Sequence, residues 1–168
     1  MEVTSMILSN EQIRQAVAAE DIVITPYQPD LLEGITYPLH LGDIISRPRT
    51  NKVINVSSDI VEIDSIPVGE EGYLLKPKDM VVWRTQERVR LSGRVVAEID
   101  GRSRMALVGV MPVAASRFIL PGSNEYQELE ICNTGRNAVL LTSGLYIGKL
   151  LFHQVGEPLQ AGSKKGLW

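Results

Sequence analysis

Cysteine and histidine are scarce in this sequence, and their scarcity limits the chemistry open to it. Among 168 residues there is one cysteine, Cys132, and there are two histidines, His40 and His153. A single cysteine excludes an intramolecular disulfide framework and a zinc site built from several cysteine ligands. Two histidines leave little capacity for a histidine-based metal centre. The sequence therefore predicts no metal held directly by protein side chains.

An excess of basic residues and a long apolar run are also lacking. The chain has 17 Lys and Arg against 20 Asp and Glu, which gives a net charge of -3 at pH 7. A nucleic-acid partner is not expected, because it needs a clear positive excess, although a few arginines in one pocket could bind a small anion. Residues 1–8 contain Glu2 and no signal-like apolar run, and no stretch approaches the ~18 apolar residues of a membrane span. We expect a cytoplasmic protein without a membrane partner.

The length and the pattern of short apolar segments predict one strand-rich domain. Domains usually have ~100–200 residues, and here short apolar segments recur between Pro and Gly turn signals every ~8–12 residues, as in barrels and sandwiches. The expected strands are residues 22–24, 39–41, 53–56, 60–63, 73–75, 80–83, 89–91, 129–132, 139–141 and 147–152. Residues 156–168 lose this pattern, so we expect a domain over residues 1–155 followed by a mobile tail.

Short helices are expected beside the strands. Ser9, with Gln12 three residues later, can form a capping box that satisfies two backbone N–H groups at a helix start. Ile13 and Val17 then give a narrow apolar stripe with helical spacing. Residues 102–110 are a candidate for a second short helix, because their apolar positions follow a period near that of an α-helix.

The densest functional signal is the run Asp100-Gly101-Arg102-Ser103-Arg104. Glycine lets the backbone turn sharply, serine offers a hydroxyl and an N–H group, and two arginines supply planar donors. Together these groups suit phosphate oxygens, particularly where a helix begins. The alternative interpretation is a solvated turn with surface arginines, which the residues alone favour because short motif matches have a high false-positive rate.

The second signal is Glu130. In a strand, Glu128, Glu130 and Cys132 share one face, and Leu129 and Ile131 share the other. If the leucine and isoleucine face the core, Glu130 faces solvent or a cleft, where a carboxylate can act as a general base or acid. The alternative is an ordinary exposed strand glutamate. Cys132 has no activating neighbour at a readable spacing, which indicates an inert thiol.

Several further segments occur in an order and spacing known from one family. They read YPLHLGD at residues 37–43, GYLLKP at residues 72–77, ERVRL at residues 87–91 and IGKLLF at residues 147–152. Residues 101–107 read GRSRMAL, which resembles the motif G-R-S-S-x-A-R. On these segments the chain resembles the dCTP deaminase family, part of the dCTP deaminase and trimeric dUTPase superfamily, over most of its length.

The resemblance implies a fold, an assembly and an activity. The fold is mainly β, a distorted β-barrel of the β-clip (dUTPase-like) type with a short N-terminal helix and one or two further short helices. The assembly is a homotrimer with sites at the subunit interfaces, and the activity is hydrolysis of dCTP to dUTP and ammonia. By resemblance, Glu130 is the general base that activates water. Arg102 and Ser103 hold the triphosphate, through which Mg²⁺ is bound.

Two positions depart from the family pattern. Leu107 stands where the motif has its second arginine, and Leu120 stands where the next family stretch, H-x-T-A-x-x-I-D-P-G, has its aspartate. A leucine cannot accept a proton, which argues against dUTP pyrophosphatase activity. Arg104, Ser116 and Arg117 lie near the changed positions in the sequence, and they complete the set of candidate nucleotide-binding residues.

Three functions therefore stay open at the level of sequence. The first is an active dCTP deaminase. The second is a catalytically impaired relative that binds a nucleotide or a protein partner on the trimer scaffold, which the leucines at positions 107 and 120 suggest. The third and weaker one is a dUTP pyrophosphatase with a relocated base at Glu125 or Glu128.

Overall fold

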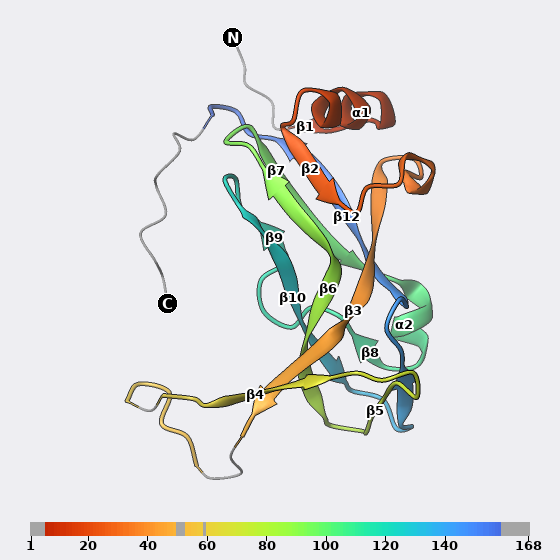
Figure 1. Cartoon of the computed structure of the whole chain (residues 1–168), viewed down its shortest axis with the longest axis vertical. Coiled ribbons are helices and arrows are strands. Elements are labelled where there is room, and N and C mark those ends of the chain that lie inside the picture. Colours follow the sequence, from red (N-terminus) through yellow and green to blue (C-terminus); the bar gives the residue numbers. More distant parts are fainter. Residues whose placement is uncertain (1–5, 50–52, 59, 159–168) are drawn as a thin grey trace.

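Antiparallel strands are the main regular structure of the chain in the computed structural model, which describes residues 6–49, 53–58 and 60–158 (Figure 1). The elements, in chain order, are β1 (Met6–Ile7), α1 (Asn10–Ala18), β2 (Ile22–Thr25), the 3₁₀ turn η1 (Pro29–Leu31), β3 (Thr36–Pro48), β4 (Ile63–Pro67), β5 (Tyr73–Leu75), β6 (Met80–Leu91), β7 (Val95–Gly101), α2 (Ser103–Leu107), β8 (Val110–Met111), β9 (Phe118–Ile119), β10 (Asn124–Asn133), β11 (Val139–Leu141) and β12 (Tyr146–Gln154). The predicted fold class, mainly β with short helices, is confirmed.

One large sheet organises the fold. Its strand order is β8-β10-β6-β3-β12-β7-β9, with β1 added to β12, β2 to β6 and β4 to β3, while β11 and β5 form a separate small sheet. Pairing shifts register in three places, on β3 against β6, on β10 against β6 and on β12 against β3. Such irregularities bend strands and increase their twist, which curls the sheet into the half-barrel of a β-clip.

The core lies inside this curl and follows the alternation of the long strands. Along β6, the odd-numbered side chains from Val81 to Leu91 are buried. Trp83 is fully buried, and its indole Nε1–H donates to the Gly42 carbonyl oxygen over 2.9 Å. The same buried row contains Glu87, a carboxylate that must have partners inside the protein.

Two of the predicted strands are wrong. Residues 53–56 form no strand, and in the 60–63 segment only Ile63 is in one, at the start of β4. Val53, Val56 and Ile60 are 91–99 % exposed on the loop that joins β3 to β4 (Figure 1). Their apolar character therefore does not reflect burial in a sheet.

Other expectations need smaller adjustments. Residues 80–83 and 89–91, predicted as two strands, are the two ends of the single strand β6. Strand β7 was not predicted, although its buried residues Val95, Ala97 and Ile99 alternate. The predicted tail of residues 156–168 lies mostly outside the described residues, which end at Pro158.

Helix α1 begins as predicted, with Ser9 as its N-cap. The Ser9 hydroxyl accepts from the Gln12 N–H over 3.3 Å, and the Ser9 N–H donates to Gln12 Oε1 over 2.9 Å. We expect Ser9→Ala to lower the free energy of unfolding by about 1 kcal/mol, because it removes the acceptor for one helix N–H group. Urea unfolding followed by circular dichroism measures this loss. Ser9→Asp is the control, since it keeps an acceptor, and an equal loss in both variants would contradict the capping role.

Candidate functional site

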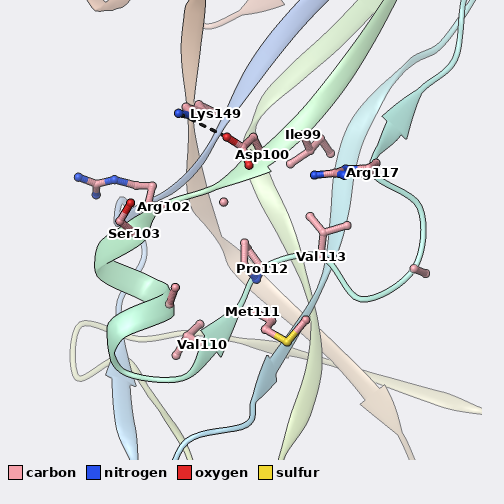
Figure 2. A pocket seen from close by; sticks show the side chains of 13 residues that line it. Ile99, Asp100, Arg102, Ser103, Val110, Met111, Pro112, Val113, Arg117 and Lys149 are labelled. Carbon is pink, nitrogen blue, oxygen red and sulfur yellow. Dashed lines mark ion pairs between the residues drawn. The ribbon is translucent and has the colours of Figure 1, made fainter.

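A pocket of about 580 Å³ lies where β7 ends and α2 begins (Figure 2). Its lining comes from the end of β7, the first turn of α2, β8, the loop after β8 and one side chain of β12. The lining residues are Ile99, Asp100, Gly101, Arg102, Ser103, Ala106, Val110, Met111, Pro112, Val113, Ala115, Arg117 and Lys149. The sequence singled out the run of residues 100–104, and the first four of these residues form one wall of this pocket.

The turn between β7 and α2 depends on a glycine. Strand β7 ends at Gly101, Arg102 caps the helix with an extended backbone, and α2 starts at Ser103. A Cβ atom at Gly101 would lie 3.3 Å from Cγ of Pro112 in the loop after β8. This close approach brings the two walls of the pocket together.

Two of the three cations that line the pocket are paired with carboxylates. Lys149 Nζ lies 3.4 Å from Asp100 Oδ2, across the β7–β12 pairing. Arg117 Nε lies 3.2 Å from Glu98 Oε1. These pairs fix the two side chains, and they also neutralise part of the positive charge that each brings to the pocket.

Arg102, the third cation, has a different environment. Among the described residues it forms no ion pair with a carboxylate. Its Nη1 donates to the Tyr146 carbonyl oxygen over 2.9 Å, and its guanidinium carbon lies 3.8 Å from the centroid of the Tyr146 ring. In Figure 2 the side chains of Arg102 and Arg117 lie on opposite sides of the pocket. Arg102 is thus the lining cation whose charge is not neutralised by a described carboxylate.

Glu130, on strand β10, does not line the pocket itself, but its carboxylate contacts a residue that does. Its neighbours Leu129 and Ile131 are buried while Glu130 is half-buried, so the predicted division of β10 into two faces is confirmed. The backbone N–H of Ala115, a lining residue, donates to Glu130 Oε2 over 3.4 Å. The carboxylate therefore lies against the loop that also carries Arg117.

Of the remaining predicted site residues, some line the pocket and some do not. Ser103 lines the pocket and is exposed, whereas Arg104 and Ser116 do not belong to the lining. The Ser116 hydroxyl oxygen accepts from the N–H of Phe118, the first residue of β9, over 3.4 Å. A nucleotide contact by any of these residues stays a prediction. Lys149 was missed by the sequence analysis, because its place in the pocket depends on the pairing of β12 with β7.

The leucines at the two departures from the family pattern are both on the surface. Leu107, at the end of α2, is 86 % exposed, and Leu120, after β9, is 60 % exposed. Neither lines the pocket.

In the part of the chain that the structure describes, no group of three or more His, Cys, Asp or Glu could hold a metal ion. No helix in that part is long and apolar enough to cross a membrane.

Cys132 offers a chemical probe of the charge on Glu130. Burial raises the pKa of the Cys132 thiol above its ordinary value, and the Glu130 carboxylate raises it further. A raised pKa means less thiolate at a given pH, so we expect alkylation by iodoacetamide to have a midpoint at higher pH than alkylation of a small free thiol. Mass spectrometry over a pH series measures this midpoint, and Cys132 is the chain's one cysteine.

Replacing Glu130 provides the comparison for this probe. Glu130→Gln removes the neighbouring negative charge and should move the alkylation midpoint to lower pH. In the unmodified chain, an alkylation midpoint of Cys132 at or below that of the small free thiol would contradict the described environment of Cys132.

A curled antiparallel sheet with a pocket at a strand–turn–helix junction defines the class of this protein as a dUTPase-like β-clip domain. The family model described as dCTP deaminase-like matches residues 7–155. The chain belongs to this family, as the sequence resemblance predicted.

Individual relatives support the same assignment. A dCTP deaminase of Buchnera aphidicola subsp. Schizaphis graminum is 30% identical over 167 residues, covering 92% of this chain and 86% of the relative. A dCTP deaminase, dUMP-forming, of Halobacterium salinarum is 32% identical over 161 residues, covering 91% of this chain and 83% of the relative. The crystal structure of a 2'-deoxycytidine 5'-triphosphate deaminase from Agrobacterium tumefaciens has a TM-score of 0.68 at 15% identity. It matches 90% of this chain, which spans about half (49%) of that longer chain.

Proposed function

We propose that this protein hydrolyses dCTP to dUTP and ammonia in the pocket at the end of β7. The observation that carries the proposal is the composition of this pocket. One wall is the turn of Gly101, Arg102 and Ser103, and the other wall includes Ala115, which is bonded to Glu130. The turn proposed to bind phosphate therefore lies on one side of the cavity, and a residue in contact with a carboxylate lies on another. The cavity volume falls within the ~300–1,000 Å³ of small-molecule sites.

The triphosphate is proposed to bind at the turn. The guanidinium of Arg102 has N–H groups that the Tyr146 carbonyl does not use, and Ser103 presents an exposed hydroxyl. Arg117 and Lys149 add positive charge at the edges of the pocket. A magnesium ion bound with the nucleotide would be held mainly by phosphate oxygens and water, as is usual for this ion, and would neutralise part of the triphosphate charge.

Glu130 is proposed as the general base. It accepts a proton from a water molecule, whose oxygen attacks C4 of the cytosine ring. The proton then passes to the exocyclic amino group, the C4–N bond breaks and ammonia leaves, while the proton of the new C4 hydroxyl moves to ring nitrogen N3. The product has a carbonyl at C4, so one water is consumed for each dUTP and ammonia formed.

We also propose that the active form is a cytoplasmic homotrimer. The support comes from Leu107 and Leu120, two large apolar side chains that are mostly exposed beside the pocket-forming elements. Large apolar side chains that a single chain leaves exposed can be removed from water when another copy binds over them. A neighbouring subunit would cover them and would complete the site.

A second candidate function is nucleotide binding without turnover. The loss of one group that stabilises a transition state typically costs ~10²–10³ in rate, and Leu107 stands where the family motif has such a group. The third candidate, a dUTP pyrophosphatase, has less support. Glu125 and Glu128 line a different pocket of about 500 Å³, together with Arg84, Tyr126 and Gln127.

Three measurements on the same protein separate these candidates. The full chain is incubated with dCTP and magnesium, ammonia is measured, and the nucleotide products are separated by chromatography. Equal amounts of ammonia and dUTP support the deaminase. Binding of dCTP in calorimetry without ammonia supports the second candidate, and release of pyrophosphate from dUTP supports the third.

A further inference from the structure

Tyr146 lies between the pocket and a hydrogen-bonded pair, His40 and Glu87. It is the first residue of β12, and it pairs with His40 of β3 at the point where the register of these two strands shifts. Its ring is 5.7 Å from the His40 ring, centroid to centroid, with an angle of 46° between the planes. On the pocket side, its ring and its carbonyl both contact Arg102.

The contact with Tyr146 orients the guanidinium in two ways. The ring fixes the plane of the group through the cation–π contact, and the carbonyl fixes its rotation in that plane through the bond from Nη1. Both partners are uncharged. Arg102 therefore keeps its full positive charge, in contrast to Arg117 and Lys149, which are held by carboxylates.

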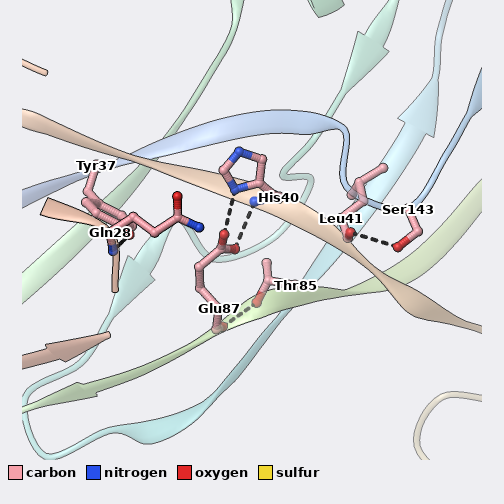
Figure 3. Close-up of polar contacts among 7 residues, drawn as sticks. All are labelled: Gln28, Tyr37, His40, Leu41, Thr85, Glu87 and Ser143. Atoms are coloured by element: carbon pink, nitrogen blue, oxygen red, sulfur yellow. Dashed lines mark hydrogen bonds and ion pairs between the residues drawn. The ribbon is translucent and has the colours of Figure 1, made fainter. Parts of the chain in front are cut away.

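Behind the Tyr146 ring lies the His40 ring, which is paired with Glu87; Figure 3 shows this pair. Glu87 is almost completely buried, and both of its carboxylate oxygens bind His40. Oε1 lies 2.6 Å from Nδ1 of the ring, and Oε2 accepts from the His40 backbone N–H over 2.8 Å. The carboxylate thus holds both the ring and the backbone of His40, and Thr85 Oγ1 donates to the Glu87 carbonyl oxygen over 2.8 Å. Such a pair fixes a side chain firmly, because separating it leaves a buried polar group without its hydrogen-bond partners.

We propose that Tyr146 is a positioning residue for Arg102, and that the His40–Glu87 pair holds Tyr146 in place. The inference rests on the proposed function for its effect on dCTP, but the contact itself can be tested without any nucleotide. The positioned guanidinium presents its remaining N–H groups in one orientation to the triphosphate. Without the Tyr146 contact, the Arg102 guanidinium would lose conformational freedom each time the nucleotide binds.

Two substitutions at Tyr146 separate the ring from its hydroxyl. Tyr146→Leu removes the aromatic face, and it should raise KM for dCTP roughly 3- to 30-fold, the range expected from a cation–π contact, with kcat nearly unchanged. Tyr146→Phe keeps the face and should behave like the unmodified protein. In an Arg102→Ala background, Tyr146→Leu should have no further effect on KM, because the two residues act through one contact.

Equal KM effects of Tyr146→Leu with and without Arg102 would show a purely structural role and would overturn the proposal. His40→Gln tests the supporting pair, since glutamine can still donate to Glu87 but lacks the ring that faces Tyr146. His40→Gln should also raise KM, but by a smaller factor than Tyr146→Leu does. An unchanged KM in His40→Gln would overturn the supporting role of the pair.

The Nε–H signal of Arg102 in ¹⁵N NMR tests the contact without dCTP. It is identified by its absence in Arg102→Ala, and a ring current from Tyr146 should shift it away from the position of a free arginine. The shift should persist in Tyr146→Phe and disappear in Tyr146→Leu. If the shift behaves in this way but the protein releases no ammonia from dCTP, the proposed function fails while the contact stands. If the signal is the same in all three proteins, the positioning role fails whatever the activity.

Discussion

The Glu130→Gln protein should release ammonia from dCTP ~10²–10⁴-fold more slowly than the unmodified chain, the usual contribution of a general acid–base group. Glutamine keeps the size and an acceptor oxygen for the Ala115 N–H, so the loop after β8 should stay in place. It cannot take a proton from water. The dissociation constant for dCTP, measured by calorimetry, should change little, because the triphosphate is proposed to bind at the turn around Arg102.

Glu128 provides the matched control for this prediction. It lies two residues away on the same face of β10, but it is exposed and lines the second pocket. Glu128→Gln should therefore release ammonia at nearly the unmodified rate. A normal rate in Glu130→Gln, or an equal loss in Glu128→Gln, would remove Glu130 from the mechanism.

Gly109→Ala should lower the free energy of unfolding by about 2–5 kcal/mol, as the sum of left-handed strain and overpacking. Gly109 has a φ of 81°, and a Cβ atom there would lie 2.4 Å from Cα and N of Gly135. The two loops are also bonded, since Thr134 N–H donates to the Gly109 carbonyl oxygen over 2.8 Å. This crossing joins the start of β8 to the end of β10, and so it joins the pocket loop to the strand of Glu130.

Gly122→Ala separates the two causes of this loss. Gly122 has a φ of 80°, almost the same as Gly109, but a Cβ atom there would meet nothing within 4 Å. It should cost only the backbone strain, about 1–2 kcal/mol. Urea unfolding measures both variants. If the two variants lose equal stability, the close contact with Gly135 is not the reason that position 109 requires a glycine.

Much of the fold could be predicted from local patterns. The capping box at Ser9 and the alternation around Glu130 were read correctly, because both depend on neighbours a few residues away. The loop between β3 and β4 was misread for a related reason. Its apolar residues, such as Val53 and Val56, satisfy a strand pattern, but within the described part of the chain no strand pairs with them. Pairing, and not alternation, decides whether such a segment becomes a strand.

The site was harder to predict than the fold. The turn at Arg102 and the carboxylate of Glu130 are far apart in the sequence, and only the family resemblance suggested that they act together. The pocket that Arg102 lines, and that Glu130 approaches through Ala115, depends on the course of β7, which was not predicted, and on the loop after β8. Tyr146 could not be found from its own neighbours, because its contact with Arg102 arises from the pairing of β12 with β7 and β3.

A crystal structure of the Glu130→Gln protein with dCTP and magnesium tests the central claim most directly, since the substrate should remain intact. We predict triphosphate oxygens on the turn of Arg102 and Ser103, with the Arg102 guanidinium still stacked on Tyr146. We also predict C4 of the cytosine ring, with its amino group, next to the side chain at position 130. A nucleotide bound beside Arg84 and Tyr126 instead, or a cytosine ring turned away from position 130, would contradict the account.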